Sequence, residues 1–354
     1  MVKLDNAWLQ HVEKPARYTG GEWNSVVKNH EEMAVTFALA FPDVYEVSMS
    51  HLGIKILYAL LNDMPDVAAE RIFAPWTDME KEMRDRQIPL FSLETKTEAK
   101  AFDFLGFTLQ YEMSYSNIVN MLDLAGIPLY SKDRDLDMPL IVAGGPCVYN
   151  IEPIADFFDI ASIGESEEWL PEILAIYKEE KAKGFPEGKK GLLKKLVKVP
   201  GTYIPSFYEP NYDGAGNFTG LTILEEEAPA NIEKRLIEDM ENAPYPVKPI
   251  VPYLDVVHDR AVLELFRGCT RGCRFCQAGM LYRPVRERTP EKLLQMAKDM
   301  IQNTGYNEIS LMSLSSADYS KLPELVDLLM EEFKGKRVSV SLPSLRIDAF
   351  SIDI

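Results

Sequence analysis

The residues that decide the fold read AVLELFRGCTRGCRFC (261–276), where an apolar run leads directly into three closely spaced cysteines. The apolar residues from 261 to 268 predict a buried strand. The cysteines follow in the pattern C-x3-C-x2-C, at the point where this strand would end. In α/β proteins the loops beyond the carboxyl ends of parallel strands are the usual site of ligand binding. The stretch therefore predicts both a β/α unit and a chemical site at its carboxyl end.

Helical and strand patterns alternate downstream of the cysteines. The predicted elements are a helix over 291–305 behind the N-cap and N1 pair Thr289-Pro290, a strand over 307–314, a helix over about 320–334 and a strand over 337–343. A spacing of about 30 residues per unit is typical of a β/α barrel. Since about three units fit before the chain ends, residues 256–354 are predicted to be the N-terminal part of a truncated barrel.

A second run of alternating elements precedes this region. Predicted strands lie at 33–41, near 71–73, and at 102–109, 140–146 and 159–164, with helices at 52–61, 78–86, 115–125 and 167–183. This pattern predicts a doubly wound, Rossmann-like α/β domain over residues 36–183. Residues 1–35 are expected to form an N-terminal arm. Residues 184–255 are expected to be a linker with a small hairpin made by TYIPSFYEP and FTGLTIL.

Composition limits the class of protein. The 38 basic and 55 acidic residues give a net charge of −17, so no global positive field favours nucleic acid as a partner. The sequence contains no apolar run of about 18 residues that could span a membrane, and its first residues lack the apolar core of a signal peptide. Four cysteines in a chain of this length do not make a disulfide framework. We therefore expect a cytoplasmic protein without a membrane partner.

The cysteine pattern points to metal chemistry. Cys269, Cys273 and Cys276 lie within eight residues, while Cys147 stands alone. Three thiolates on one loop can hold three irons of a 4Fe–4S cluster and leave the fourth iron open to a ligand that is not protein. A structural zinc site needs a fourth protein ligand, for which His258 and Cys147 are candidates outside the loop. A non-catalytic iron–sulfur or zinc module is therefore the alternative to a catalytic cluster.

The C-x3-C-x-aromatic-C pattern at the end of a first barrel strand resembles the radical SAM superfamily. The resemblance implies that Cys269, Cys273 and Cys276 bind a 4Fe–4S cluster whose open iron is chelated by S-adenosylmethionine. It further implies reductive cleavage of that cosubstrate to methionine and a 5′-deoxyadenosyl radical, which would act on a substrate that the sequence does not identify. A reducing electron donor of the flavodoxin or ferredoxin type is the implied partner.

The same resemblance suggests residues that contact S-adenosylmethionine. Phe275 matches the aromatic residue beside the last cysteine, whose backbone faces the adenine. The segment SLSS (313–316) replaces the glycine-glycine-acid motif of many members, which makes its serines candidates for the amino group. Serines and an arginine near the third strand are candidates for the carboxylate or ribose. The alternative is that the serines are ordinary strand and turn residues. The candidates are Ser313, Ser315, Ser316, Ser339, Ser341 and Arg346.

Three segments of the first domain, 41–62, 106–128 and 141–174, resemble the cobalamin-binding-type domain that precedes the barrel in one subgroup of this superfamily. The resemblance implies that a corrin binds at the strand ends, where Gly144 and Gly145 would allow close approach of the backbone. The D-x-H-x-x-G motif that supplies a cobalt ligand is absent, so His51 is interpreted as a loop or cap residue. A degenerate domain kept as a scaffold or lid is the alternative.

These observations predict a radical SAM enzyme. If cobalamin binds, methyl transfer to an unactivated carbon is the first reaction to expect. If it does not, rearrangement or sulfur insertion is expected, the latter including modification of RNA. Six arginines between 267 and 288, against the single acid Glu287, are expected mostly to pair with acids on neighbouring elements.

Overall fold

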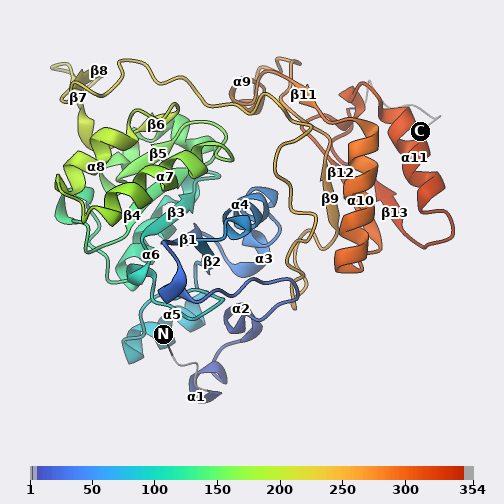
Figure 1. The fold of residues 1–354 in the computed structure, drawn as a ribbon, viewed down its shortest axis with the longest axis horizontal. Coiled ribbons are helices and arrows are strands. Elements are labelled where there is room, and N and C mark those ends of the chain that lie inside the picture. Colours follow the sequence, from blue (N-terminus) through green and yellow to red (C-terminus); the bar gives the residue numbers. More distant parts are fainter. Residues whose placement is uncertain (1, 3–5, 347–354) are drawn as a thin grey trace. The chain divides into compact units, whose positions relative to one another are not determined.

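The computed structural model describes residue 2 and residues 6–346. The chain divides into two compact units (Figure 1). The first consists of Met1–Gly21 and Ser25–Leu236, and the second of Glu22–Asn24 and Ile237–Ile354. The last eight residues of the sequence lie outside the described part, so the predicted barrel is traced only as far as residue 346.

A six-stranded sheet is the centre of the first unit. Its strands are β1 (Val35–Phe41), β2 (Val67–Phe73), β3 (Phe104–Thr108), β4 (Leu140–Gly144), β5 (Ile160–Ser162) and β6 (Thr202–Tyr203). They lie in the order β2-β1-β3-β4-β5-β6, and all pair in parallel except β5 with β6. The order 2-1-3-4-5 is a common one in doubly wound sheets. In it, successive strands are first added on one side of β1 and then on the other, so the strand order reverses between β1 and β3. The carboxyl ends of β1 and β3 therefore flank the position where such sheets bind ligands, and β4 is the next strand beyond β3.

Helices connect these strands and bury their apolar stripes. They are α3 (Tyr45–Ser48), α4 (Leu52–Asp63), α5 (Thr77–Arg86), α6 (Tyr115–Leu124), α7 (Trp169–Ala182) and α8 (Gly188–Leu196), preceded in the arm by α1 (Asn6–Leu9) and α2 (Ala16–Thr19). The helix α6 buries Ile118, Met121 and Leu122 and ends before Gly126, whose φ of 65° is the left-handed conformation that closes a helix. In α7, the buried Trp169 donates from Nε1 to Thr202 Oγ1 (2.7 Å), which ties the helix to β6.

Short 3-10 helices complete the chain. They are η1 (His30–Glu32), η2 (Ala99–Ala101), η3 (Glu112–Ser114), η4 (Ser131–Asp133), η5 (Pro146–Asn150), η6 (Glu152–Phe157), η7 (Pro205–Phe207) and η8 (Ser316–Asp318). Most of them stand directly before or after a strand. In particular, η3, η5 and η8 follow the carboxyl ends of β3, β4 and of the strand that ends at Met312.

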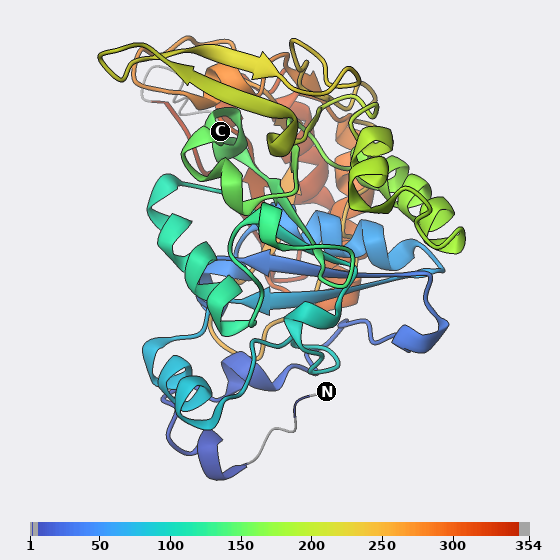
Figure 2. The ribbon, with the colours of Figure 1, turned by 90° about the vertical axis from the view of Figure 1, so that its left-hand side faces the viewer.

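The segment predicted as a linker contains more structure than expected. The helix α8 lies inside its lysine-rich stretch because Leu192, Leu193 and Leu196 form a buried stripe, while the lysines remain at least partly exposed. The strand β6 joins the main sheet, although two residues are too few for a periodic pattern to be visible in the sequence. The predicted hairpin is present as β7 (Tyr208–Tyr212) and β8 (Phe218–Ile223), which are drawn in yellow in Figure 2. The first half of TYIPSFYEP belongs to β6 and η7 instead.

The second unit is built on three parallel strands. These are β9 (Ala261–Glu264), β12 (Glu308–Met312) and β13 (Ser339–Ser341), in the order β13-β12-β9. The helices α10 (Pro290–Thr304) and α11 (Leu322–Glu332) connect them, as the sequence predicts. Within the described residues these strands form an open sheet and not a closed barrel. At the start of α10, Thr289 Oγ1 accepts from Lys292 N (3.3 Å) and Pro290 takes the first helical position.

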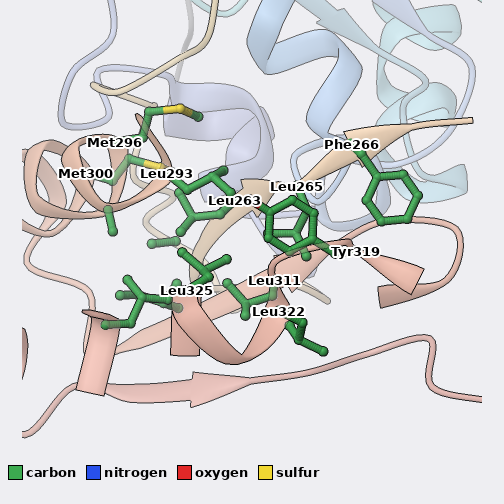
Figure 3. Close-up of a cluster of buried hydrophobic side chains, with 14 of the residues drawn as sticks. Leu263, Leu265, Phe266, Leu293, Met296, Met300, Leu311, Tyr319, Leu322 and Leu325 are labelled. Carbon is green, nitrogen blue, oxygen red and sulfur yellow. The ribbon is translucent and has the colours of Figure 1, made fainter. Parts of the chain in front are cut away.

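One continuous core holds the sheet and its two helices together. Leu263, Leu293, Leu311 and Leu325 are fully buried at its centre (Figure 3). The strand β9 continues into β10 (Phe266–Arg267), and Phe266 stacks on Tyr319, the residue that follows η8 (ring centroids 6.4 Å apart). Residues 22–24 of the predicted arm belong to this unit, because Trp23 forms a bridge with Val251. The core thus fixes where each strand ends.

Candidate functional site

The cysteine loop, residues 268–285, leaves the sheet after β10 and returns to it at β11 (Arg286–Glu287). The two short strands pair antiparallel, Phe266 opposite Glu287, so the loop begins and ends at one place. This closure requires Gly268, whose φ is 96°. A Cβ at that position would lie 2.4 Å from the carbonyl oxygen of Pro284. The loop is therefore a defined excursion from the carboxyl end of β9.

Inside the loop the three cysteines differ in exposure. Cys273 and Cys276 are exposed and Cys269 is half-buried, and all three are free thiols. The amide of Cys276 donates to Cys273 O (3.0 Å), and Arg283 Nε donates to Cys269 O (3.1 Å). The short helix α9 (Ala278–Leu281) follows, with Gly279 facing the Cys269 carbonyl. Backbone contacts, not the thiols, hold the loop in place.

The donor chemistry of the loop fits an iron–sulfur cluster that keeps one iron open. Among residues 2 and 6–346, no three His, Cys, Asp or Glu side chains form a ready metal site. His258, one of the candidates for a fourth zinc ligand, precedes β9 and thus lies at the opposite end of that strand from the loop; its Nδ1 lies 3.2 Å from Arg260 NH2. Three thiols on a single exposed loop suit a three-coordinate attachment. They do not make a closed tetrahedral zinc site.

An acidic residue links the cysteine loop to the ends of the other two strands. Arg271, between the first two cysteines, donates from Nε to Asp318 Oδ2 (2.7 Å) and from NH2 to Asp318 Oδ1. Arg346, after β13, donates from NH1 to both oxygens of Asp318 at 3.1 Å. The hydrogen bond from Arg271 lowers the pKa of Asp318 to about 2, so the carboxylate is ionised at neutral pH.

The remaining arginines of the loop region bond mainly to the backbone. Arg267 pairs with Glu264 (Nε to Oε1, 2.9 Å), but Arg283 donates to a carbonyl, and Arg286 donates to Ile237 O (2.5 Å). The fully buried Arg288 donates to Met240 O and lies over the ring of Tyr245. Three of the six arginines pair with acids, namely Arg267 and Arg288 with Glu264 and Arg271 with Asp318. Several of the six also clamp the preceding segment onto the loop.

The predicted S-adenosylmethionine contacts fall into two groups. Phe275 is 92% exposed beside Cys276, and Ser313 lies half-buried at the end of β12. In contrast, the Ser316 hydroxyl is fully buried and donates to Leu311 O (3.0 Å), which commits it to the fold. The Ser315 hydroxyl is buried and interacts with the Asp318 carboxylate, whose pKa it helps to lower.

The third strand offers fewer of the expected contacts. Ser339 is the first residue of β13, pairs with Glu308 and donates to Asn307 O, so it lies at the end of the strand away from the cysteine loop. Ser341 is the last residue of β13 and is half-buried. Arg346 lies at the correct edge, where it bonds to Asp318. Its role in cosubstrate binding stays a prediction.

A second candidate site lies at the carboxyl edge of the first unit's sheet. Gly144 ends β4, and a Cβ there would meet no atom within 4 Å, so the space above it is open. Gly145 is different, since its φ is 98° and a Cβ would lie 2.8 Å from Leu109 O. The second glycine therefore serves the packing of the β3 and β4 ends against each other. Only Gly144 has the open surroundings that a large ligand needs.

Polar side chains near this edge are partly buried. His51 stands at the N-cap of α4 without a capping hydrogen bond from its side chain, and its Nδ1 is buried with no partner among the described residues. Burial lowers the pKa of His51, which favours the neutral imidazole. Burial likewise raises the pKa of the Cys147 thiol. It also raises the pKa of Tyr115, the first residue of α6, to about 12. These groups are neutral at pH 7.

Sequence reasoning missed Asp318 and Gly268. Asp318 lies in SADY, two residues beyond the candidate Ser316, and its contact with Arg271 reveals its importance. Gly268 could have been found, because a glycine directly between a strand and a ligand loop often marks a left-handed or close-packed position.

Comparison with known families agrees with this geometry. Residues 53–205 match the family model for the N-terminal region of radical SAM proteins, and residues 263–353 match the radical SAM superfamily model. The second match contains the last two residues of β9, the cysteine loop, β12 and β13. Together the two matches support assignment of the chain to the radical SAM superfamily.

Individual relatives resemble most of the chain. An uncharacterized protein of Methanocaldococcus jannaschii is 26% identical over 328 residues, which are 91% of this chain and 58% of that protein. The radical S-adenosylmethionine methyltransferase TsrM from Kitasatospora setae, with cobalamin and a 4Fe–4S cluster bound, aligns with a TM-score of 0.50. This alignment has 11% identity over 90% of this chain and 58% of TsrM. At that identity the similarity concerns the fold. The chain spans less than two thirds of the length of either protein.

No helix in the described part of the chain is long and apolar enough to cross a membrane.

Proposed function

We propose that the chain binds a 4Fe–4S cluster through Cys269, Cys273 and Cys276 and cleaves S-adenosylmethionine reductively to start radical chemistry on a substrate. The observation that carries this proposal is the loop itself: three free thiols, two of them exposed, on a closed excursion from the carboxyl end of β9. When bound, a cluster with one open iron supplies the electron that breaks the sulfonium bond of S-adenosylmethionine.

The residues around the loop would bind and orient the cosubstrate. Ser313 and Ser315 carry hydroxyl groups at the end of β12, and Phe275 presents an exposed ring beside the last cysteine. Arg346 carries a positive charge at the same edge and is suited to a carboxylate. A flavodoxin- or ferredoxin-type donor would supply the electron.

Anaerobic reconstitution of the purified chain with iron and sulfide tests this assignment. The wild-type chain should bind four irons per cluster and, once reduced, give an electron paramagnetic resonance signal that changes when S-adenosylmethionine is added. Replacing any one of the three loop cysteines by alanine should abolish the signal. Cys147→Ala is the matched control and should keep it. Equal iron in all four variants, or stoichiometric zinc held in preference to iron, would contradict the proposal.

Cobalamin-dependent methyl transfer is the reaction that we propose for this site. The open space above Gly144 supports it, as does the 2-1-3-4-5 order of the sheet, whose switch point lies between β1 and β3, the strand next to β4. TsrM, which has a similar fold, binds cobalamin and is a methyltransferase. When bound, cobalamin would serve as the methyl carrier. Gly144 would allow its approach, and the neutral His51 is not required as a ligand.

Binding of cobalamin is measured directly by its visible absorption after gel filtration of the mixture. The wild-type chain should retain the corrin, and Gly144→Phe should release it because the new ring fills the open space. Phe275→Leu changes an exposed side chain of the other unit and is the control. If the wild-type chain retains no corrin, the methyl-transfer proposal fails and rearrangement or sulfur insertion takes its place.

A further inference from the structure

Asp318 is the point at which three separate segments of the second unit meet. It accepts two hydrogen bonds from Arg271 of the cysteine loop and two from Arg346 beyond β13, and it lies itself in η8 after β12. The two hydrogen bonds from Arg271 form a bidentate pair, the arrangement in which a guanidinium binds a carboxylate most strongly. One carboxylate therefore joins the carboxyl ends of all three strands.

The segment that carries Asp318 is firmly held. The Asp318 amide donates to Ser315 O (2.8 Å), and the buried Ser316 hydroxyl donates to Leu311 O. Tyr319, the next residue, packs in the core of the unit and donates from its hydroxyl to Arg288 O (2.7 Å) (Figure 3). Asp318 is thus a fixed anchor, whose side chain is 20% exposed.

The cysteine loop has little core of its own at the point that Asp318 holds. Residues 270–277, which contain two of the cysteines, are all exposed. Arg271 lies between Cys269 and Cys273, so whatever fixes its guanidinium also limits the positions of the flanking thiols.

We infer that Asp318 is a positioning residue of the cluster site: through Arg271 it holds the C-x3-C segment in the arrangement that binds iron. This inference rests on the proposed function. Asp318 touches neither a thiol nor, on this account, the cosubstrate. Its removal should therefore weaken the hold on the cluster and the order of the loop, and any change in the affinity for S-adenosylmethionine should come through Arg346, which Asp318 also holds.

The test compares Asp318→Asn with Glu332→Gln in the whole chain. Glu332 is a matched control because it also bridges two cations of the same unit, Lys298 (3.0 Å) and Lys336 (2.6 Å), at a similar exposure of 22%. One measurement is the rate at which a chelator removes iron from the reconstituted chain. The other is hydrogen exchange of residues 269–282 in the metal-free chain, which reports loop order without any cluster.

Asp318→Asn should release iron about fivefold faster than wild type and exchange faster in the loop, since a partly exposed charged pair contributes modestly. Arg271→Gln should do the same, and the double variant should be no worse than either single variant. Glu332→Gln should match wild type in both measurements. Exchange in β12 should stay unchanged in every variant, which shows that the unit remains folded.

Three results separate the possibilities. Wild-type iron release and loop exchange in Asp318→Asn would overturn the inference. Unchanged iron release with loss of S-adenosylmethionine binding would also overturn it, because Asp318 would then act on the cosubstrate, directly or through Arg346, and not on the cluster. Faster loop exchange in Asp318→Asn, in a chain that binds no iron even as wild type, would support the positioning role while refuting the proposed function.

Discussion

The two units of the chain use charged side chains in opposite ways. In the first unit, Arg71 pairs with Glu94 (2.7 Å) and Arg134 pairs with Asp159 (3.0 Å), and these four side chains are at most 1% exposed. In the second unit, the ion pairs at the cysteine loop stay in contact with solvent, with the Arg271 side chain 46% exposed. The buried pairs of the first unit therefore stabilise its fold, whereas the partly exposed pairs at the cysteine loop position the residues of an open site.

The largest expected effect comes from breaking a buried pair. Arg71→Met leaves the Glu94 carboxylate buried without its partner, which should destabilise the first unit by about 3–5 kcal/mol. Arg271→Met, at the exposed loop, should cost less than about 1 kcal/mol. Hydrogen exchange of β1 for the first variant and of β12 for the second measures each unit separately. Equal costs for the two substitutions would remove the contrast between the units.

The two adjacent glycines at the end of β4 sharpen the same contrast within the first unit. Gly145→Ala should destabilise it by about 1–3 kcal/mol, because alanine is strained at a φ of 98° and its Cβ would meet Leu109 O. Gly144→Ala should change stability by less than about 0.5 kcal/mol, because its surroundings are open. Thermal unfolding of the two variants side by side gives the answer. A large loss in Gly144→Ala would mean that the space is not free for a ligand.

A smaller, pH-dependent effect is expected where the arm meets the first unit. Burial alone would raise the pKa of Glu46, but hydrogen bonds from Arg17 and Lys14 outweigh it and lower that pKa to about 2. The carboxylate therefore stabilises the folded state fully above the unfolded pKa of about 4.3, and the contribution is lost as the pH falls toward 2.

Glu46→Gln measures this contribution. The variant should be less stable than wild type by about 1–2 kcal/mol between pH 6 and 8, and the difference should shrink below about pH 4. Urea unfolding midpoints of both chains across this range provide the measurement. A difference that grows as the pH falls would show that the sign of the linkage is wrong.

Much of the fold could be predicted from the sequence because its signals are local. The strands β1, β3 and β4 are apolar runs, and α10 begins at a Thr-Pro pair whose capping bond is present. The helix α8 was not predicted, because the lysines around its three buried leucines obscure the apolar pattern. The strand β6 was not predicted, because its two residues are recognisable as a strand only through their pairing with β5.

The sequence predicts the cysteines of the candidate site, but not the residues that hold them in position. The three cysteines are recognised by their spacing, because closely spaced thiolates are the usual ligands of such a cluster. Asp318 could not be identified, because an ion pair between residues 271 and 318 depends on how β9 and β12 align. For the same reason the sequence treated Gly144 and Gly145 alike, although the approach of Leu109 separates their roles.

The central claim is that the three loop cysteines of the second unit carry a cluster that acts on S-adenosylmethionine. The decisive measurement is chromatography for 5′-deoxyadenosine after the reconstituted chain has been reduced with dithionite in the presence of S-adenosylmethionine. We expect the wild-type chain to form 5′-deoxyadenosine and the Cys273→Ala variant to form none. A wild-type chain that carries its full cluster but forms none, or equal amounts from both chains, would contradict the account.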